Sequence, residues 1–283
     1  MSDNKIFQEM VAEFIGTFIL VLFGVGSVCI AVWVGAYGLW VVAVMFALGV
    51  ALGVYASGKV SGGHINPAVT ITMAVCAGFP WRKVPAYIVA QVLAAFVAAA
   101  FIHYLYADIL AAFEASKEIV RGEPGSQLSA MGYTTFAPNP GIIGNTPEAM
   151  ARVTNVQWFI SEMVATAILL FGIFYLLDEN NTLAPQANLA PTFIGLLVAA
   201  LIAVEAPISM TALNPARDMG PRLWAALAGW GDIAFPGPKG GWWIPTVSTI
   251  VGALIGGLVY QKAYKKVFVT DQPQKPSPEE TTK

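Results

Sequence analysis

The sequence predicts an all-α membrane protein in which six transmembrane helices and two re-entrant half-helices form an inverted repeat. Three observations support this fold class. Of the 283 residues, 57% are hydrophobic and 11% are charged, with a mean hydropathy of +0.65, which is typical of a chain that crosses a bilayer several times. The tripeptide Asn-Pro-Ala occurs at residues 66–68 and again at 214–216. The pattern Glu-x-x-x-Thr-x-Ile-Leu also occurs twice, starting at Glu13 and at Glu162.

Six apolar stretches are long enough to cross a membrane, because about 20 helical residues span the hydrocarbon core. They lie at about residues 14–34, 40–57, 84–106, 158–177, 189–206 and 242–260. The first has no basic segment before it and is too long for a signal-peptide core, so we interpret it as a retained transmembrane helix.

The two repeated patterns divide this domain, which spans residues 1–283, into halves of three spans each. Three is an odd number, so the halves must cross the membrane in opposite directions. The predicted parts are a first repeat (8–107, with a half-helix at 67–77), a long extracellular loop (108–156), a second repeat (157–264, with a half-helix at 215–227) and a disordered cytoplasmic tail (269–283).

Each Asn-Pro-Ala tripeptide begins a helix too short to span the membrane. Asparagine caps free N–H groups at a helix start, and proline fits the first turn because its missing N–H is not needed there. After Pro67 about ten residues, or roughly 15 Å of helix, remain before Gly78 and Pro80 end it. The helix after Pro215 is similarly short. In an inverted repeat, two such N-termini meet near the membrane centre.

The tripeptides Asn66-Pro67-Ala68 and Asn214-Pro215-Ala216 are therefore candidates for the centre of a pore. Two facing helix N-termini place partial positive charge there, which repels cations. The asparagine amides can also donate hydrogen bonds to a passing hydroxyl group. The alternative is that each asparagine only caps its helix. The repetition in one inverted frame favours a channel domain for neutral polar solutes.

The irregular segments before the two tripeptides are expected to line this pore, because non-helical backbone at membrane depth is tolerated only inside protein or beside water. The residues expected to contribute backbone groups are Gly62, Gly63, His64, Ile65, Met210, Ala212 and Leu213. A metal site at the histidine is disfavoured, because the only other histidine, His103, lies in a predicted span.

Several charged residues lie at membrane depth and need an explanation. Arg217 is close to a half-helix start, where it offers a fixed cation and a hydrogen-bonding fork to the pore; the alternative is a charge that faces headgroups. Glu13 and Glu162 lie inside apolar spans, where ionisable groups are costly. A proton relay is one reading, but their repeat-related positions favour hydrogen bonding to the re-entrant backbone. Glu205 has no counterpart in the first half, and the sequence assigns it no role.

The segments SGGHINPAVT (61–70), LNPARDMGP (213–221) and LAGWG (227–231) resemble those of the aquaporin and glycerol-facilitator family, also called major intrinsic proteins. The resemblance covers nearly the whole chain. It implies an aquaporin-like fold in a lipid bilayer, with one pore in each subunit of a homotetramer. The pair Asp218 and Arg222, together with Pro245 and the loop sequence FAPNPG (136–141), resembles the glycerol-conducting branch.

The same resemblance implies a selectivity filter formed by Phe46, Ile202, Thr211 and Arg217, matched by their positions relative to the two tripeptides. Typical bacterial glycerol facilitators have Trp, Gly and Phe at the first three positions, and water-selective members usually have His at the second. This chain matches neither set, so the sequence leaves the size of the filter open.

We therefore expect a passive channel that excludes ions and protons and conducts glycerol, other small neutral solutes and water. No cofactor or metal is implied, and the net charge of −2 disfavours a nucleic-acid partner. One alternative is a water-dominant aquaporin with little glycerol flux. Another is an ion-coupled secondary transporter, since such proteins also use inverted repeats and broken helices. An enzyme is the weakest reading, because no nucleophile–base pair or phosphate loop is evident.

Basic residues predict the orientation. Arg82 and Lys83 fall on the same side of the six spans as Lys262, Lys265 and Lys266. The positive-inside rule places that side, and both termini, in the cytoplasm. With the bacterial character of the motifs, this predicts an integral protein of a bacterial inner membrane.

Overall fold

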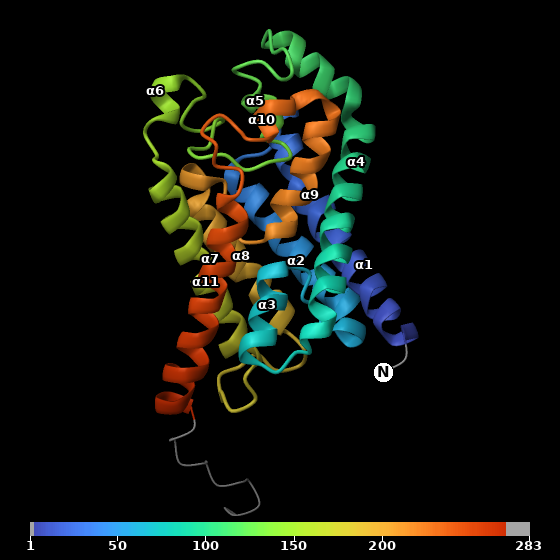
Figure 1. Cartoon of the computed structure of the whole chain (residues 1–283), viewed down its shortest axis with the longest axis vertical. Coiled ribbons are helices and arrows are strands. Elements are labelled where there is room, and N and C mark those ends of the chain that lie inside the picture. Colours follow the sequence, from blue (N-terminus) through green and yellow to red (C-terminus); the bar gives the residue numbers. More distant parts are fainter. Residues whose placement is uncertain (1–2, 270–283) are drawn as a thin grey trace, which may run out of the picture.

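The computed structural model describes residues 3–269 as a bundle of helices that run along one long axis (Figure 1). No strand occurs among these residues. Six helices in this part of the chain are long and apolar enough to cross a membrane, which confirms the predicted fold class. Of the predicted tail, residue 269 ends the last helix, and residues 270–283 lie outside the described part of the chain.

The helices follow the order that the sequence predicts. The long ones are α1 (Asp3–Cys29, extended by Ile30–Val34), α2 (Leu39–Ser61), α4 (Val84–Ser116), α7 (Asn155–Leu177), α8 (Ala190–Ser209) and α11 (Ile244–Leu258, extended by Val259–Val269). The half-length ones are α3 (Pro67–Cys76) and α9 (Pro215–Ala225, extended by Ala226–Trp230), and the connections hold the single turns α5 (Gln127–Ala130), α6 (Pro147–Met150) and α10 (Gly231–Ala234).

The two half-length helices occupy opposite halves of the bundle. In Figure 1, α3 lies toward the end of the molecule that holds both ends of the described chain, here called the terminal end, and α9 lies toward the other end. Each packs against the last long helix of the opposite half: α3 against α11, and α9 against α4. Because each half-helix packs against the other half, the two halves interlock and the N-termini of α3 and α9 face each other.

Small residues set how closely the long helices approach. A Cβ atom added at Gly252 would overlap the Met163 carbonyl of α7, and one added at Gly256 would overlap the Ala167 carbonyl. The Gly-x-x-x-Gly pattern of α11 therefore packs within the chain, against α7, as small residues do where helix backbones nearly touch.

The structure corrects the predicted boundary of the third span. Helix α4 continues to Ser116, ten residues past the predicted end at 106 and into the segment predicted as loop. Residues 107–116 contain no glycine or proline, and Leu110 is completely buried. The helix is therefore held by packing at its far end as well as by its apolar composition.

The rest of the 108–156 segment is also ordered against the bundle. Tyr133, Thr134 and Thr135 are completely buried. Lys239 donates hydrogen bonds to the carbonyl oxygens of Ala137, Met150 and Val153. Burial lowers the pKa of this lysine below its usual range.

The space around each glycine predicts different effects for two glycine-to-alanine changes, one at the α7–α11 contact and one in α1. We expect Gly256→Ala to destabilise the protein by about 1–3 kcal/mol, because the methyl group must push two backbones apart. In Gly26→Ala, a helical position with only ordinary contact to Ile102, we expect no loss, because alanine is the better helix former. Thermal unfolding in detergent, followed by the loss of monodisperse protein, measures both. Equal melting temperatures for the two variants would contradict this packing.

Candidate functional site

The two asparagines of the repeated tripeptides cap the half-helices as predicted from the sequence. Asn66 accepts a hydrogen bond from Ala68 N at 2.8 Å, and Asn214 accepts from Ala216 N at 2.9 Å and from Arg217 N at 3.4 Å. Both side chains are buried. Each cap fixes the rotation of the amide, so its N–H groups point away from its own helix.

The same amides also cross-link the two halves. Asn66 Nδ2 donates to the Leu213 carbonyl at 3.0 Å, and Asn214 Nδ2 donates to the Ile65 carbonyl at 2.8 Å. An amide has two N–H donors. One donor of each asparagine therefore holds the opposite loop, and the other is available to the cavity that both residues line.

Glu13, which is fully buried, holds the loop that leads into α3. It accepts hydrogen bonds from the backbone N–H groups of His64 at 2.9 Å and Ile65 at 2.6 Å, and from Ser61 Oγ at 2.6 Å. Gln91 of α4 donates to the same carboxyl group at 2.7 Å. Sequence reasoning did not select Gln91, although an uncharged polar side chain inside an apolar span was a usable signal.

Glu162, also fully buried, does the same for the loop that leads into α9. It accepts from Ala212 N at 2.7 Å, Leu213 N at 3.1 Å and Ser209 Oγ at 2.7 Å. Ser61 and Ser209 thus play matching parts in the two halves. Both serines lie at the repeat spacing, which is a signal that the sequence contained and that we did not use.

These contacts hold a backbone that is unfavourable by itself. Ile65, Met210, Thr211 and Leu213 all have φ between 44° and 61°, the left-handed region that costs non-glycine residues about 1 kcal/mol or more. In this conformation successive carbonyl groups do not form helical hydrogen bonds. The two carboxyl groups and the two asparagines stabilise this arrangement against that cost.

The predicted filter residues lie where two cavities adjoin. A cavity of about 120 Å³ extends from the loop residues Gly62 and Gly63 past both asparagines, and a second, of about 390 Å³, opens on the other side. Phe46, Ile202 and Arg217 border both cavities. Thr211 borders the first, together with His64, Ile65, Ala212 and Leu213, and Met210 borders the second.

The first cavity is lined by groups of two chemical kinds. The loop backbone, the asparagine amides and Arg217 are polar, and the remaining lining includes the aliphatic side chains of Val50, Val54, Val69, Leu169, Ile173, Ile194 and Val198. A solute in this cavity therefore meets both hydrogen-bonding groups and apolar surface.

Arg217 is positioned by an aromatic ring and by the long loop. Its guanidinium carbon lies 5.0 Å from the centre of the Phe46 ring, and Nη1 donates to the Tyr133 carbonyl at 3.4 Å. Its Nε is buried and has no hydrogen-bond partner among the described residues, and the residue lines both cavities. Burial raises the pKa of the Tyr133 phenol, which stays neutral and contacts His103 Nδ1 at 2.9 Å.

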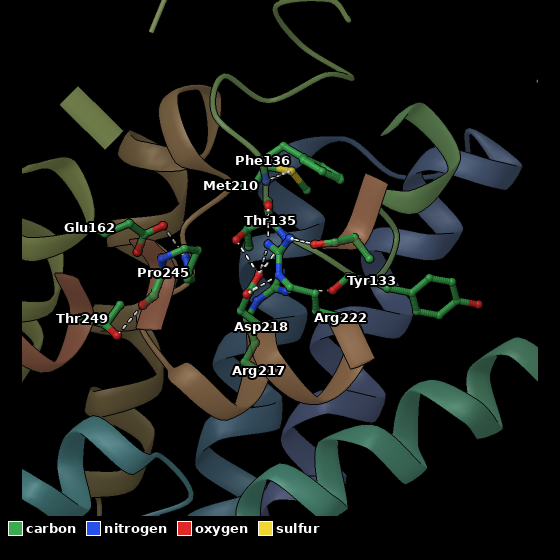
Figure 2. Close-up of polar contacts among 12 residues, drawn as sticks. Tyr133, Thr135, Phe136, Glu162, Met210, Arg217, Asp218, Arg222, Pro245 and Thr249 are labelled. Carbon is green, nitrogen blue, oxygen red and sulfur yellow. Dashed lines mark hydrogen bonds and ion pairs between the residues drawn. The ribbon is translucent and has the colours of Figure 1, made fainter. Parts of the chain in front are cut away.

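Asp218 and Arg222 form a buried ion pair at 2.8 Å that also binds the long loop (Figure 2). Asp218 accepts from Thr135 N at 2.9 Å and Thr135 Oγ1 at 2.6 Å, and Arg222 donates to the Thr135 carbonyl at 2.7 Å. The pair therefore anchors the loop segment that carries Tyr133, whose carbonyl accepts a hydrogen bond from Arg217. Thr135 was not selected from the sequence, because its partners are distant along the chain.

Comparison with known proteins identifies the family to which this chain is similar. The profile of the family described as "Major intrinsic protein" matches residues 1–260. The chain belongs to the major intrinsic protein family. Among similar proteins of this family are the glycerol uptake facilitator protein of Shigella flexneri, 43% identical over 90% of this chain and 87% of that one, and the one of Pseudomonas aeruginosa, 41% identical over 91% and 88%.

More distant members of the major intrinsic protein family match as well. Human aquaporin-9 is 39% identical over 91% of this chain and 82% of its own length. The crystal structure of the aquaglyceroporin from Plasmodium falciparum superimposes with a TM-score of 0.76 at 26% identity, covering 92% of this chain and 97% of that one. The resemblance stated from the sequence motifs is therefore confirmed.

The buried ion pair yields a prediction about stability. We expect Asp218→Asn to destabilise the protein by about 3–5 kcal/mol, because it leaves the buried charge of Arg222 without a partner. The control is Glu114→Gln, whose partner Arg121 is 27% exposed; such a pair contributes about 1 kcal/mol or less. Thermal unfolding in detergent compares the two variants. A loss for Asp218→Asn no larger than that of the control would show that the ion pair does not anchor the loop.

Proposed function

We propose that this protein is a passive channel that conducts glycerol, other small neutral solutes and water, and that excludes ions and protons. The observation that carries this proposal is the meeting of two half-helix N-termini beside a cavity whose junction with the next is lined by Phe46, Ile202 and Arg217. Identity of 41–43% to glycerol uptake facilitators supports the choice of solute.

The mixed polar and aliphatic lining of the cavity suits a polyol. Hydroxyl groups can accept hydrogen bonds from Arg217 and from the free N–H groups of Asn66 and Asn214. They can donate to loop carbonyls that the asparagines leave unused, such as those of Gly62, Gly63, His64 and Ala212. The carbon atoms of the solute contact the aliphatic side chains of the lining. Each hydroxyl exchanges water for a protein partner, which keeps the desolvation cost low.

The same site opposes ions. The N-termini of α3 and α9 carry partial positive charge, and Arg217 adds a full one, so a cation is repelled at the centre. An anion would lose its hydration shell among the aliphatic side chains of the lining, which costs several kcal/mol. Water molecules that accept hydrogen bonds from Asn66 and Asn214 are oriented with their hydrogens outward on both sides, which interrupts a proton wire.

We further propose that the molecule is a homotetramer in a bacterial inner membrane, with N- and C-termini in the cytoplasm. Bacterial relatives and the basic residues of the terminal end support the membrane and the orientation. Large apolar side chains are exposed along the long helices, as a lipid or subunit contact requires, among them Val89, Leu196 and Val204.

Stopped-flow light scattering on proteoliposomes tests the function. We expect glycerol entry well above that of empty vesicles and unchanged by a proton or sodium gradient or by a protonophore. Flux that depends on either gradient would instead support an ion-coupled transporter. Fast water efflux with background glycerol entry would indicate a water-dominant channel. The absence of both fluxes would contradict the proposal of an open channel.

The side chain of Ile202 is expected to limit the filter. In Ile202→Gly we expect glycerol permeability to rise several-fold, because removing a branched side chain widens the junction between the two cavities, while water permeability changes less. The matched control is Val204→Gly on the same helix, whose side chain is 82% exposed on the outside of the bundle. It carries the same loss of helix propensity without touching the pore. The same vesicle assay, normalised to the water flux of each variant, compares them, and equal ratios for both variants would remove Ile202 from the filter.

A further inference from the structure

The imidazole of His64 lies in the loop before α3, and the proposed conduction uses only the backbone carbonyl of this residue. The ring packs against the rings of Phe79 and Tyr87, whose centres lie 4.7 Å and 5.3 Å away. One ring nitrogen, Nδ1, lies 3.2 Å from Thr70 Oγ1 of α3. The other, Nε2, makes no hydrogen bond with the described residues. This nitrogen needs an explanation, because His64 lines the first cavity.

The Nε2 atom reaches the cavity beside Gly62. A Cβ atom added at Gly62 would lie 3.5 Å from Nε2, and Gly62 is exposed and lines the same cavity. The Nε2 atom is also not one of the fully buried side-chain atoms that lack a partner. It is therefore open to a solute. Whether it donates or accepts depends on which ring nitrogen carries the hydrogen.

Thr70 determines the position of that hydrogen. Its completely buried hydroxyl group has one hydrogen and two lone pairs, and it has three polar neighbours. Gln91 Nε2 can only donate, and it does so at 3.0 Å. The Asn66 carbonyl can only accept, and it lies 3.1 Å from Thr70 Oγ1, as in the bond that a threonine inside a helix forms with the carbonyl four residues earlier. This bond uses the one hydrogen of Thr70, so its remaining lone pair accepts from Nδ1–H of His64.

The opposite arrangement would leave a contact without a hydrogen. If Thr70 donated to Nδ1, its oxygen and the Asn66 carbonyl oxygen would face each other at 3.1 Å with no hydrogen between them. Gln91 cannot reverse its part, because its amide nitrogen also donates to Glu13 at 2.7 Å, and a reversed amide would bring two acceptor oxygens together there. The network therefore assigns the hydrogen to Nδ1. A neutral imidazole carries one hydrogen, so Nε2 of His64 is a free acceptor.

The other polar side chains that line this cavity offer it no acceptor. Arg217 has only donors, and the amide oxygens of Asn66 and Asn214 are occupied as caps of the half-helices. The Oγ1 atom of Thr211 is buried. Among the described residues, Nε2 of His64 is therefore the side-chain acceptor of a cavity whose other polar side chains donate.

We propose that His64 is a specificity-determining residue of the pore: its Nε2 accepts a hydrogen bond from the solute, and Thr70 and Gln91 are positioning residues that keep this nitrogen free of hydrogen. This inference rests on the proposed solute channel. A solute hydroxyl group that accepts from Asn66 can be followed, on the same carbon chain, by one that donates to His64. The solutes that gain from this contact are small neutral molecules with several hydroxyl or N–H groups, such as polyols and amides.

The vesicle assay tests the acceptor with His64→Phe, which keeps a flat ring beside Phe79 and Tyr87 but has no nitrogen. The readout is the ratio of glycerol to water permeability, which does not depend on the number of folded channels. We expect the ratio to fall about five-fold, the effect of one neutral hydrogen bond. Water is less affected, because a water molecule can turn to another acceptor of the loop, whereas a hydroxyl group on a carbon chain cannot. An unchanged ratio would overturn the inference.

Thr70→Val and Thr70→Ser test the positioning role. Valine resembles threonine in shape but offers Nδ1 of His64 no acceptor, so we expect part of the hydrogen to move to Nε2 and the ratio to fall by up to about five-fold. Serine keeps the hydroxyl group and should retain the wild-type ratio. Adding Thr70→Val to His64→Phe should lower the ratio no further, because both changes act through the same nitrogen. Additive effects of the two changes would contradict the positioning role.

Nuclear magnetic resonance of protein labelled with ¹⁵N at histidine tests the tautomer without measuring any flux. The chain has two histidines, and the spectrum of His64→Phe identifies the signals that belong to His64. At neutral pH we expect a hydrogen on Nδ1 and none on Nε2 in the wild type and in Thr70→Ser, and a hydrogen on Nε2 in part of the Thr70→Val molecules. A hydrogen on Nε2 in the wild type, alone or together with one on Nδ1, would overturn the inference.

The wild-type protein keeps the two proposals distinguishable. If wild-type vesicles take up glycerol no faster than empty ones, the proposed function fails, and this inference falls with it. If the wild type conducts glycerol but His64→Phe keeps its ratio to water, only the inference is overturned.

Discussion

The structure depends on finding hydrogen-bond partners for backbone N–H and carbonyl groups that lie in the middle of the membrane outside regular helices. Lipid offers no partners, so each exposed N–H or carbonyl group there would cost several kcal/mol. The loops before α3 and α9 solve this with buried side chains: Glu13 and Glu162 accept their N–H groups, and Asn66 and Asn214 donate to the Leu213 and Ile65 carbonyls. The carbonyls left over face a cavity, where a solute can use them.

This solution also explains why the two halves interlock. Each asparagine satisfies a carbonyl of the other loop, and each half-helix packs against a long helix of the other half. Neither half can complete its own loop, so the facing helix N-termini are a consequence of folding. The charge pattern that favours neutral solutes is therefore built from the same contacts that hold the chain together.

The halves are not equivalent, and the predicted selectivity filter lies where they differ. Gln91 supports Glu13, whereas Glu162 shares Ser209 with a second acid, Glu205. Only the second half-helix carries the arginine of the predicted filter, and the long loop contacts that half-helix through Asp218 and Arg222. The pseudo-symmetric frame forms the centre of the bundle, and the asymmetric additions lie beside the predicted constriction.

The sequence by itself determined the six spans, the two half-helices and the family, because hydrophobic length, Asn-Pro caps and repeated motifs are local patterns. It did not determine that α4 continues to Ser116, because packing of Leu110 against distant residues extends that helix. Nor did it predict Thr135, Gln91 or the contact between Glu205 and Ser209. Their partners lie on other elements or depend on side-chain direction, so only the tertiary structure decided which polar groups meet in the bundle.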